Sequence, residues 1–124
     1  MAKRTFIMVV DDDPGFVELL RKVLRQHGYT VMLATDGDTA LKMSRYHSGH
    51  IDLLLTDVIM PTMSGPTLAQ KLLAQRPHTQ VLFMSGMTNA AAIPMELRDR
   101  STFVEKHPPL DGLVQTVQKV LQDS

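Results

Sequence analysis

Short apolar segments alternate with amphipathic segments along this chain, and that alternation constrains its fold more than any other feature of the sequence. Apolar runs of strand length occupy residues 6–10, 29–34, 51–56, 81–84 and 102–104. The segments between them carry apolar side chains at helical spacing, most clearly over residues 14–27, 38–48, 66–75 and 110–121. Strands and helices in this alternation predict a parallel sheet with right-handed crossovers and helices on both faces.

Capping and turn residues mark where the expected helices begin and end. Asp13 followed by Pro14 is a helix start, with the aspartate as N-cap and the proline in the first helical position. Between residues 88 and 101 the signals conflict, because three alanines favour helix whereas Pro94 lacks an amide hydrogen and restricts the residue before it. We therefore expect a short, broken or poorly ordered fourth helix.

The bulk composition limits the classes of protein to which the chain can belong. Its 124 residues have the length of one domain, which we expect to span residues 1–124. Thirteen basic and thirteen acidic side chains balance, so no overall field favours nucleic acid or an anionic membrane. Cysteine is absent, which fits a reducing compartment and excludes thiol catalysis. The first apolar run is too short to cross a membrane, so we expect a soluble, cytoplasmic protein.

Polar side chains stand where four of the apolar runs end. Asp11 and Asp12 follow the first run, Asp57 follows the third, Ser85 follows the fourth, and Lys106 comes just after the fifth. The carboxyl ends of parallel strands meet at one edge of a sheet, which is where open α/β sheets bind ligands. Three carboxylates held close together repel one another unless a cation joins them. The pattern therefore predicts a site for a hard divalent metal and an incoming phosphoryl group.

The residue types indicate a role for each of these groups. Because the third aspartate of the first cluster serves as a cap, Asp11 and Asp12 remain to bind Mg²⁺, which prefers oxygen ligands and retains waters. The carboxylate of Asp57 can attack phosphorus to give an acyl phosphate. Ser85 offers a hydroxyl donor and Lys106 a positive charge to phosphoryl oxygens. Taken singly, each residue also has a plainer interpretation as a cap, a turn residue or an exposed side chain.

Taken together, these residues resemble the receiver domain of two-component response regulators, including receivers that are fused to hybrid histidine kinases. The resemblance covers essentially the whole chain. It rests on the order and spacing of Val9-Val10-Asp11-Asp12-Asp13, then Asp52 to Asp57 with Met60-Pro61 and Gly65, then Met84-Ser85-Gly86, then Phe103-Val104-Glu105-Lys106. Each motif is weak by itself, whereas the four in this order and spacing are highly specific.

The resemblance implies an α/β, flavodoxin-like (βα)5 fold, a doubly wound parallel sheet of five strands in the order 2-1-3-4-5. It implies that Asp57 accepts a phosphoryl group from the phosphohistidine of a histidine kinase or phosphotransfer protein. Mg²⁺ is the implied cofactor. Its implied ligands are Asp12 directly, Asp11 through water, Asp57, and the backbone carbonyl of Ile59.

The resemblance also implies a switch. Ser85 and Lys106 would contact the phosphoryl oxygens, and Phe103 matches the aromatic position that swings inward when the hydroxyl is drawn toward the phosphate. Phosphorylation adds about −1.5 to −2 units of charge and three acceptor oxygens. A local event of this kind would reshape the face made by the fourth helix, fifth strand and fifth helix. The plain alternative for Phe103 is an ordinary core aromatic.

The chain departs from the family pattern in two loops. The family usually has a proline directly after the lysine, in a cis peptide that aims the ammonium, whereas His107 follows Lys106 here. A cis bond before a residue other than proline costs about 3–4 kcal/mol, so we expect a trans peptide and a shifted loop. Ser64 replaces the acidic residue that often precedes the loop glycine, and we expect that replacement to change little.

Two apolar residues occupy positions whose side chains tune hydrolysis in this family. Ile59 lies two residues after the phosphoacceptor position, and Met87 lies two residues after Ser85. We hypothesise that both obstruct an attacking water and that the acyl phosphate is long-lived. Among the histidines, His27 and His47 stand near expected helix C-termini, where a cationic ring interacts favourably with the helix dipole.

The sequence therefore predicts a phosphoacceptor receiver that passes a kinase signal to a downstream protein or fused domain. The main alternative is a protein-binding module with the same fold whose output does not depend on phosphate. A true phosphohydrolase is disfavoured, since residues 58–61 after the nucleophile supply no second acid or base. We expect no enzymatic turnover of an external substrate, no nucleic-acid binding by this chain, no membrane partner, and a monomer.

Overall fold

Five parallel strands form one sheet in the order β2-β1-β3-β4-β5, which confirms the expected flavodoxin-like fold. The computed structural model describes residues 4–86, 94–98, 100–106 and 109–122. The strands span Phe6–Val10 (β1), Thr30–Ala34 (β2), Leu53–Asp57 (β3), Gln80–Ser85 (β4) and Ser101–Glu105 (β5). The helices span Pro14–Gln26 (α1), Gly37–Tyr46 (α2), Gly65–Gln75 (α3), Met95–Arg98 (α4) and Asp111–Gln122 (α5).

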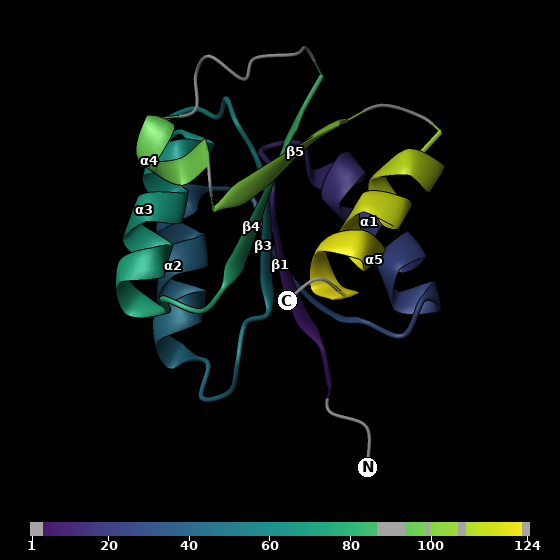
Figure 1. The fold of residues 1–124 in the computed structure, drawn as a ribbon, viewed down its shortest axis with the longest axis horizontal. Helices are drawn as coiled ribbons and strands as arrows, with labels where there is room; N and C mark the ends of the chain where they lie inside the picture. Colours follow the sequence, from purple (N-terminus) through teal and green to yellow (C-terminus); the bar gives the residue numbers. More distant parts are fainter. Residues whose placement is uncertain (1–3, 87–93, 99, 107–108, 123–124) are drawn as a thin grey trace.

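The helices cover both faces of the sheet, with α1 and α5 on one side and α2, α3 and α4 on the other (Figure 1). Alternate residues of each strand point to opposite faces, so Met8 and Val10 enter the core beneath α2 and α3. Ile7 and Val9 enter the second core, beneath α1 and α5. All five residues of β3 are buried, as expected for a central strand that is covered on both faces.

The observed boundaries differ from the expected ones by one or two residues at several places. The second helix ends at Tyr46 and does not reach Ser48, because His47 has an extended backbone with φ −82° and ψ 120°. The third strand begins at Leu53, later than the apolar run that predicted it, and it includes Asp57 as its last residue. The phosphoacceptor candidate is therefore fixed by strand pairing, since Asp57 is in register with a residue of β4.

Side chains cap the helices that begin near the carboxyl edge of the sheet. The expected cap at Asp13 is confirmed, because its carboxylate accepts hydrogen bonds from the backbone N–H groups of Gly15 and Phe16. Ser64 is the N-cap of α3, and its hydroxyl accepts a hydrogen bond from the Thr67 N–H at 3.2 Å. Ser64 therefore has a capping role, which serine fills as well as an acid would.

The helices are short. The longest that the structure describes is α1 with 13 residues, and α4 has four. In the described parts of the chain, no helix combines the length and apolar character needed to cross a membrane. A short fourth helix was expected and is found in the part that can be described. Residues 87–93 and 99 lie outside the described residues, so a break in that helix stays a prediction.

Candidate metal and phosphoryl site

The site lies at the carboxyl edge of the sheet, at the point where the strand order reverses between β1 and β3. Ligands bind open α/β sheets in the crevice at such a point. Asp11 directly follows β1, and its backbone N–H donates to the carbonyl of Ala34 at the end of β2. Its side chain is fully buried, and its Oδ1 accepts a hydrogen bond from the Asp13 N–H at 2.9 Å. The same turn therefore fixes this carboxylate and begins α1.

Three carboxylates meet at this edge, as the sequence predicted. Oxygen atoms of Asp11, Asp12 and Asp57 all lie within 4.8 Å of one another. Asp12 is exposed, whereas Asp57 is 8% exposed and Asp11 is completely covered. The group thus combines two buried acids with one that faces solvent, so that a small ion or phosphoryl group can approach from the open side.

Lys106 is the cation that the structure places within this cluster. Its Nζ lies 2.6 Å from Oδ2 of Asp11 and 3.2 Å from Oδ2 of Asp57. The residue follows β5, and its backbone N–H donates to the carbonyl of Ser85 at 2.8 Å, which continues the pairing of β4 with β5. One ammonium is therefore shared between two buried carboxylates that come from different strands.

Burial and charge act against each other on these groups. Burial raises the pKa of Asp11 above its ordinary value of 3.8, and the ion pair with Lys106 and the Asp13 N–H offset this only in part. Burial by itself would lower the pKa of Lys106, but the ion pairs with Asp11 and Asp57 outweigh it and raise that pKa above 10.5. The cluster keeps an excess of negative charge, which favours a divalent cation.

The two switch candidates lie on neighbouring strands. Ser85 is the last residue of β4 and is 5% exposed. Phe103 lies in the middle of β5, in register with Phe83, and its half-buried ring packs against the core beneath α2 and α3. The structure thus brings Ser85 to the predicted edge, next to the strand that carries Phe103.

The loop after β3 approaches the candidate phosphoacceptor closely. The Gly65 N–H donates to the carbonyl of Val58 at 2.8 Å, and a Cβ at Gly65 would collide with the carbonyl oxygen of Asp57. Only glycine fits there without moving the strand end. Thr62 in the same loop has φ of 66°, a region that a β-branched residue rarely adopts. The side chain of Ile59 is 63% exposed, which leaves an apolar group facing solvent beside the site.

The sequence interpretation assigned no functional role to Phe16. This residue lies in the first turn of α1, and the Nζ of Lys106 lies 5.0 Å from the centroid of its ring. The signal was present in the sequence, since an aromatic residue follows the acidic pair by one helical turn. Apolar helical spacing accounts for the residue equally well, so the sequence alone does not distinguish a core residue from one at the site.

Some expectations fall where the structure gives no description. Met87 and His107 lie outside the described residues, so the obstruction by Met87 and the trans peptide at His107 remain predictions. His27 and His47 are the C-cap residues of α1 and α2, the positions near helix ends that were expected for them.

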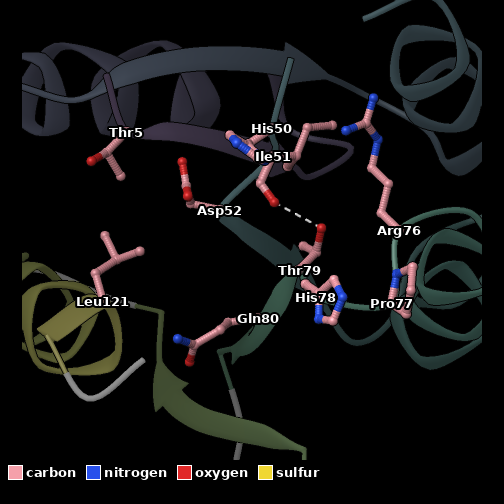
Figure 2. Close-up of a pocket in the computed structure, with 10 residues that line it drawn as sticks. All are labelled: Thr5, His50, Ile51, Asp52, Arg76, Pro77, His78, Thr79, Gln80 and Leu121. Atoms are coloured by element: carbon pink, nitrogen blue, oxygen red, sulfur yellow. Dashed lines mark hydrogen bonds between the residues drawn. The ribbon is translucent and has the colours of Figure 1, made fainter. Parts of the chain in front are cut away.

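A pocket of about 620 Å³ lies at the opposite edge of the sheet, where β3 and β4 begin (Figure 2). Three of its polar side chains already have partners. Asp52 accepts a hydrogen bond from the Phe6 N–H, and the Thr79 hydroxyl donates to the carbonyl of Ile51 at 2.7 Å. Arg76 points away from the pocket centre and donates to carbonyl groups at the C-terminal end of α2. These residues hold the loops together, so the acidic edge is the better functional site.

The acidic edge fits a magnesium ion by the chemistry of its donors. Hard carboxylate oxygens from two strand ends face one another across less than 4.8 Å, and one of them belongs to an exposed residue. Mg²⁺ is bound in proteins by one or two carboxylates together with waters and phosphate oxygens. Asp12 and Asp57 can serve as such ligands, while Asp11 is held by Lys106.

A parallel five-stranded sheet in this order, with an acidic cluster at its carboxyl edge, defines a flavodoxin-like α/β domain with a ligand site at its topological switch point. Within that class of domain the chain belongs to the response regulator receiver domain family, whose family model matches residues 7–118. Receiver domains are signalling modules of two-component systems.

Relatives of known identity agree with this assignment. The chain is 33% identical over 119 residues to the sensor kinase CckA of Brucella abortus, covering 95% of this chain and 12% of that protein. It is 31% identical over 116 residues to the response regulator receiver protein CpdR of the same organism, covering 93% of this chain and 95% of CpdR. The chain thus spans only a small part of some curated relatives and almost all of another.

A solved structure provides a direct comparison of the fold. The response regulator TrrA of Thermotoga maritima, in complex with Mg²⁺-BeF, matches with a TM-score of 0.80 and 28% identity over 94% of this chain and 98% of that one. TrrA in complex with the histidine kinase ThkA matches with a TM-score of 0.79 and 30% identity, with the same coverage.

Proposed function

We propose that this chain is the phosphoacceptor receiver of a two-component phosphorelay, in which Asp57 takes a phosphoryl group from a phosphohistidine with the help of Mg²⁺. The observation that carries the proposal is the shared ammonium of Lys106, which joins Asp57 to Asp11 within an acidic cluster. Asp12 supports the proposal, because its exposed carboxylate lies close to both buried acids, where a metal ion could be bound.

The chemistry follows from the position of the nucleophile. An Oδ atom of Asp57 forms the new P–O bond while the P–N bond to the donor imidazole breaks and its electron pair returns to nitrogen. Asp57 is 8% exposed at a strand end, so that its carboxylate is held in one orientation yet reachable from solvent. When bound, Mg²⁺ would neutralise negative charge on the carboxylates and on the phosphoryl oxygens.

Two donors of this chain would meet the phosphoryl oxygens. The ammonium of Lys106 already lies 3.2 Å from Oδ2 of Asp57 and can move to a phosphoryl oxygen as charge develops there. Ser85 ends the neighbouring strand and would donate its hydroxyl to a second oxygen. Asp12 would hold the metal, as would Asp57 and the backbone carbonyl of Ile59, with Asp11 acting through water.

The output would come from β5 and its neighbours. Movement of the Ser85 hydroxyl toward the phosphoryl group makes room for the ring of Phe103, which is half-buried in the resting structure. A shift of the Phe103 ring would alter β5, and α5 would respond because it packs against β4 and β5. We propose that this surface binds a downstream protein or a fused domain.

The donor would be a histidine kinase or a histidine phosphotransfer protein. TrrA, whose fold is the same, is known in complex with the kinase ThkA. CckA is itself named a sensor kinase, and the chain corresponds to 12% of its length. A separate receiver and a receiver attached to its kinase are both compatible with these relatives.

The test is the intact mass of the protein after incubation with acetyl phosphate and Mg²⁺. We expect a gain of one phosphoryl group that requires Mg²⁺ and disappears in Asp57→Asn. Asp38→Asn, which removes an exposed acid in the first turn of α2, serves as the matched control and should be phosphorylated normally. No gain in the folded wild type would refute the proposal and favour a phosphate-independent binding module.

A further inference from the structure

The ring of Phe16 lies against the lysine of the site. The Nζ of Lys106 lies 5.0 Å from the ring centroid, within the range of about 6 Å in which an ammonium is attracted to an aromatic face. The attraction is stronger where water is excluded, and the Lys106 side chain is only 18% exposed. Its ammonium is therefore held by two carboxylates and one aromatic ring.

The position of Phe16 is fixed by the same turn that builds the acidic cluster. Asp13 accepts a hydrogen bond from the Phe16 N–H, and the Asp13 N–H in turn donates to the carboxylate of Asp11. Pro14 presets the backbone of this first helical turn. The ring also packs against the core beneath α1 and α5. The turn therefore fixes the backbone of Phe16, and packing against this core restrains its ring.

The two carboxylate partners of Lys106 are not permanent in a working site. The proposed reaction turns Asp57 into an acyl phosphate, and a cation in the cluster draws the carboxylate of Asp11 toward itself. The ring binds neither metal nor phosphate, so its attraction for the ammonium persists through both changes. The residue after Lys106 is a histidine, so no prolyl ring restricts the chain there.

We propose that Phe16 is a positioning residue that keeps the ammonium of Lys106 over the phosphoacceptor when the carboxylates are engaged. The inference rests on the proposed function, because it concerns the rate of phosphoryl transfer to Asp57. Phe16 touches none of the reacting atoms and acts through Lys106. Loss of the ring should slow phosphorylation without weakening Mg²⁺ binding.

The kinetic test compares Phe16→Leu, which keeps an apolar side chain, with Phe16→Tyr, which keeps the ring. Phosphorylation by acetyl phosphate at saturating Mg²⁺ should be about 2- to 30-fold slower for Phe16→Leu, as expected from a cation–π attraction of about 0.5–2 kcal/mol. Phe16→Tyr should retain most of the rate. In a Lys106→Met background, Phe16→Leu should cause no additional loss, because the group on which the ring acts is absent.

A merely structural role gives a different pattern. It would slow Phe16→Leu equally with and without Lys106, or would slow Phe16→Tyr as much as Phe16→Leu, and either result would overturn the inference. Leu19→Ala, a substitution of an exposed residue on the same helix, controls for general loosening of α1 and should leave the rate unchanged. Midpoints of thermal unfolding establish that every variant compared is folded.

A second readout does not depend on phosphorylation. The ε-methylene protons of Lys106 should show an upfield ring-current shift in the NMR spectrum of the wild type, and Phe16→Leu should abolish it. Absence of that shift in the wild type would overturn the positioning role. Should the wild type accept no phosphoryl group while the shift is present, the proposed function would fail and the contact between ring and ammonium would stand.

Discussion

Replacing Lys106 with methionine should destabilise this protein far more than the loss of an ordinary surface lysine. Its ammonium lies 2.6 Å from Asp11 and 3.2 Å from Asp57, and both acids are buried. Methionine keeps much of the side-chain volume but removes the charge. The substitution therefore leaves two buried carboxylates close together, without the cation that they share.

The distances set the size of the effect. At an effective dielectric constant of about 20, the two ion pairs correspond to roughly 6 and roughly 5 kcal/mol of Coulomb attraction. Desolvation of the three groups cancels most of this, and removing one partner of a buried pair costs about 3–5 kcal/mol in practice. Lys106 keeps some exposure, so we expect about 3 kcal/mol, or a fall in Tm of about 10–15 °C in a domain of this size.

The assay is thermal unfolding followed by far-ultraviolet circular dichroism at neutral pH in the presence of EDTA. Lys71→Met removes an exposed lysine from α3 and should leave Tm almost unchanged. Adding Asp11→Asn to Lys106→Met should restore most of the lost stability, because the fully buried charge is then gone. Mg²⁺ at ten times its dissociation constant should stabilise the wild type by about 1.4 kcal/mol.

The sign of the pH dependence provides a further check. The pKa of Lys106 is raised in the folded protein, so its contribution is fully present below about 10.5 and is lost as the pH rises through the folded value. In Lys106→Met the penalty should shrink as the pH falls, because Asp11, whose pKa is already raised, becomes protonated. A Tm within 2 °C of the wild type in EDTA, or no rescue by Asp11→Asn, would refute this account.

Three further predictions concern the loops around the site. Gly65→Ala should lower both Tm and the phosphorylation rate, because the added Cβ displaces the backbone of Asp57. The expected loss in free energy of unfolding is about 1–3 kcal/mol. Gly112→Ala is the control and should be tolerated, because a Cβ there meets no other atom. Ile59→Asn combined with Met87→Glu should shorten the half-life of the acyl phosphate, and an unchanged or longer half-life would contradict the proposed obstruction of water. Asp36→Ala should lower the free energy of unfolding by about 1 kcal/mol in urea titrations, because the cap of α2 is lost. The pKa of Asp36 is lowered by the Thr39 N–H, so this difference should be present above about pH 4 and disappear as the pH falls through the folded value.

Much of the fold could be predicted because the sequence carries its signals locally. Apolar runs of strand length identified the five strands, helical spacing identified four of the described helices, and the Asp13-Pro14 pair predicted the start of α1. The signals for α4 conflicted, and only a short or broken helix was expected there. The ends of helices were less predictable, because they depend on the backbone conformation of single residues. At His47, for example, an extended backbone ends α2 before the predicted position. The strand order came from the resemblance to receiver domains, since periodicity does not say which strands pair.

The site was predictable in its members but not in its contacts. Polar residues that follow parallel strands must meet at one edge, so the grouping of Asp11, Asp12, Asp57, Ser85 and Lys106 follows from topology. The sharing of one ammonium between two carboxylates depends on side-chain positions that no local pattern encodes.

By itself, then, the sequence determined the class of fold, the edge at which chemistry takes place and the residue types available there, because these depend on local patterns and on the direction of parallel strands. The tertiary structure alone decided the electrostatics. Burial of Asp11, the reach of Lys106 across from β5, and the approach of Phe16 from α1 join segments up to 95 positions apart in the chain. Their distances fix how strongly charges interact, and only packing sets those distances.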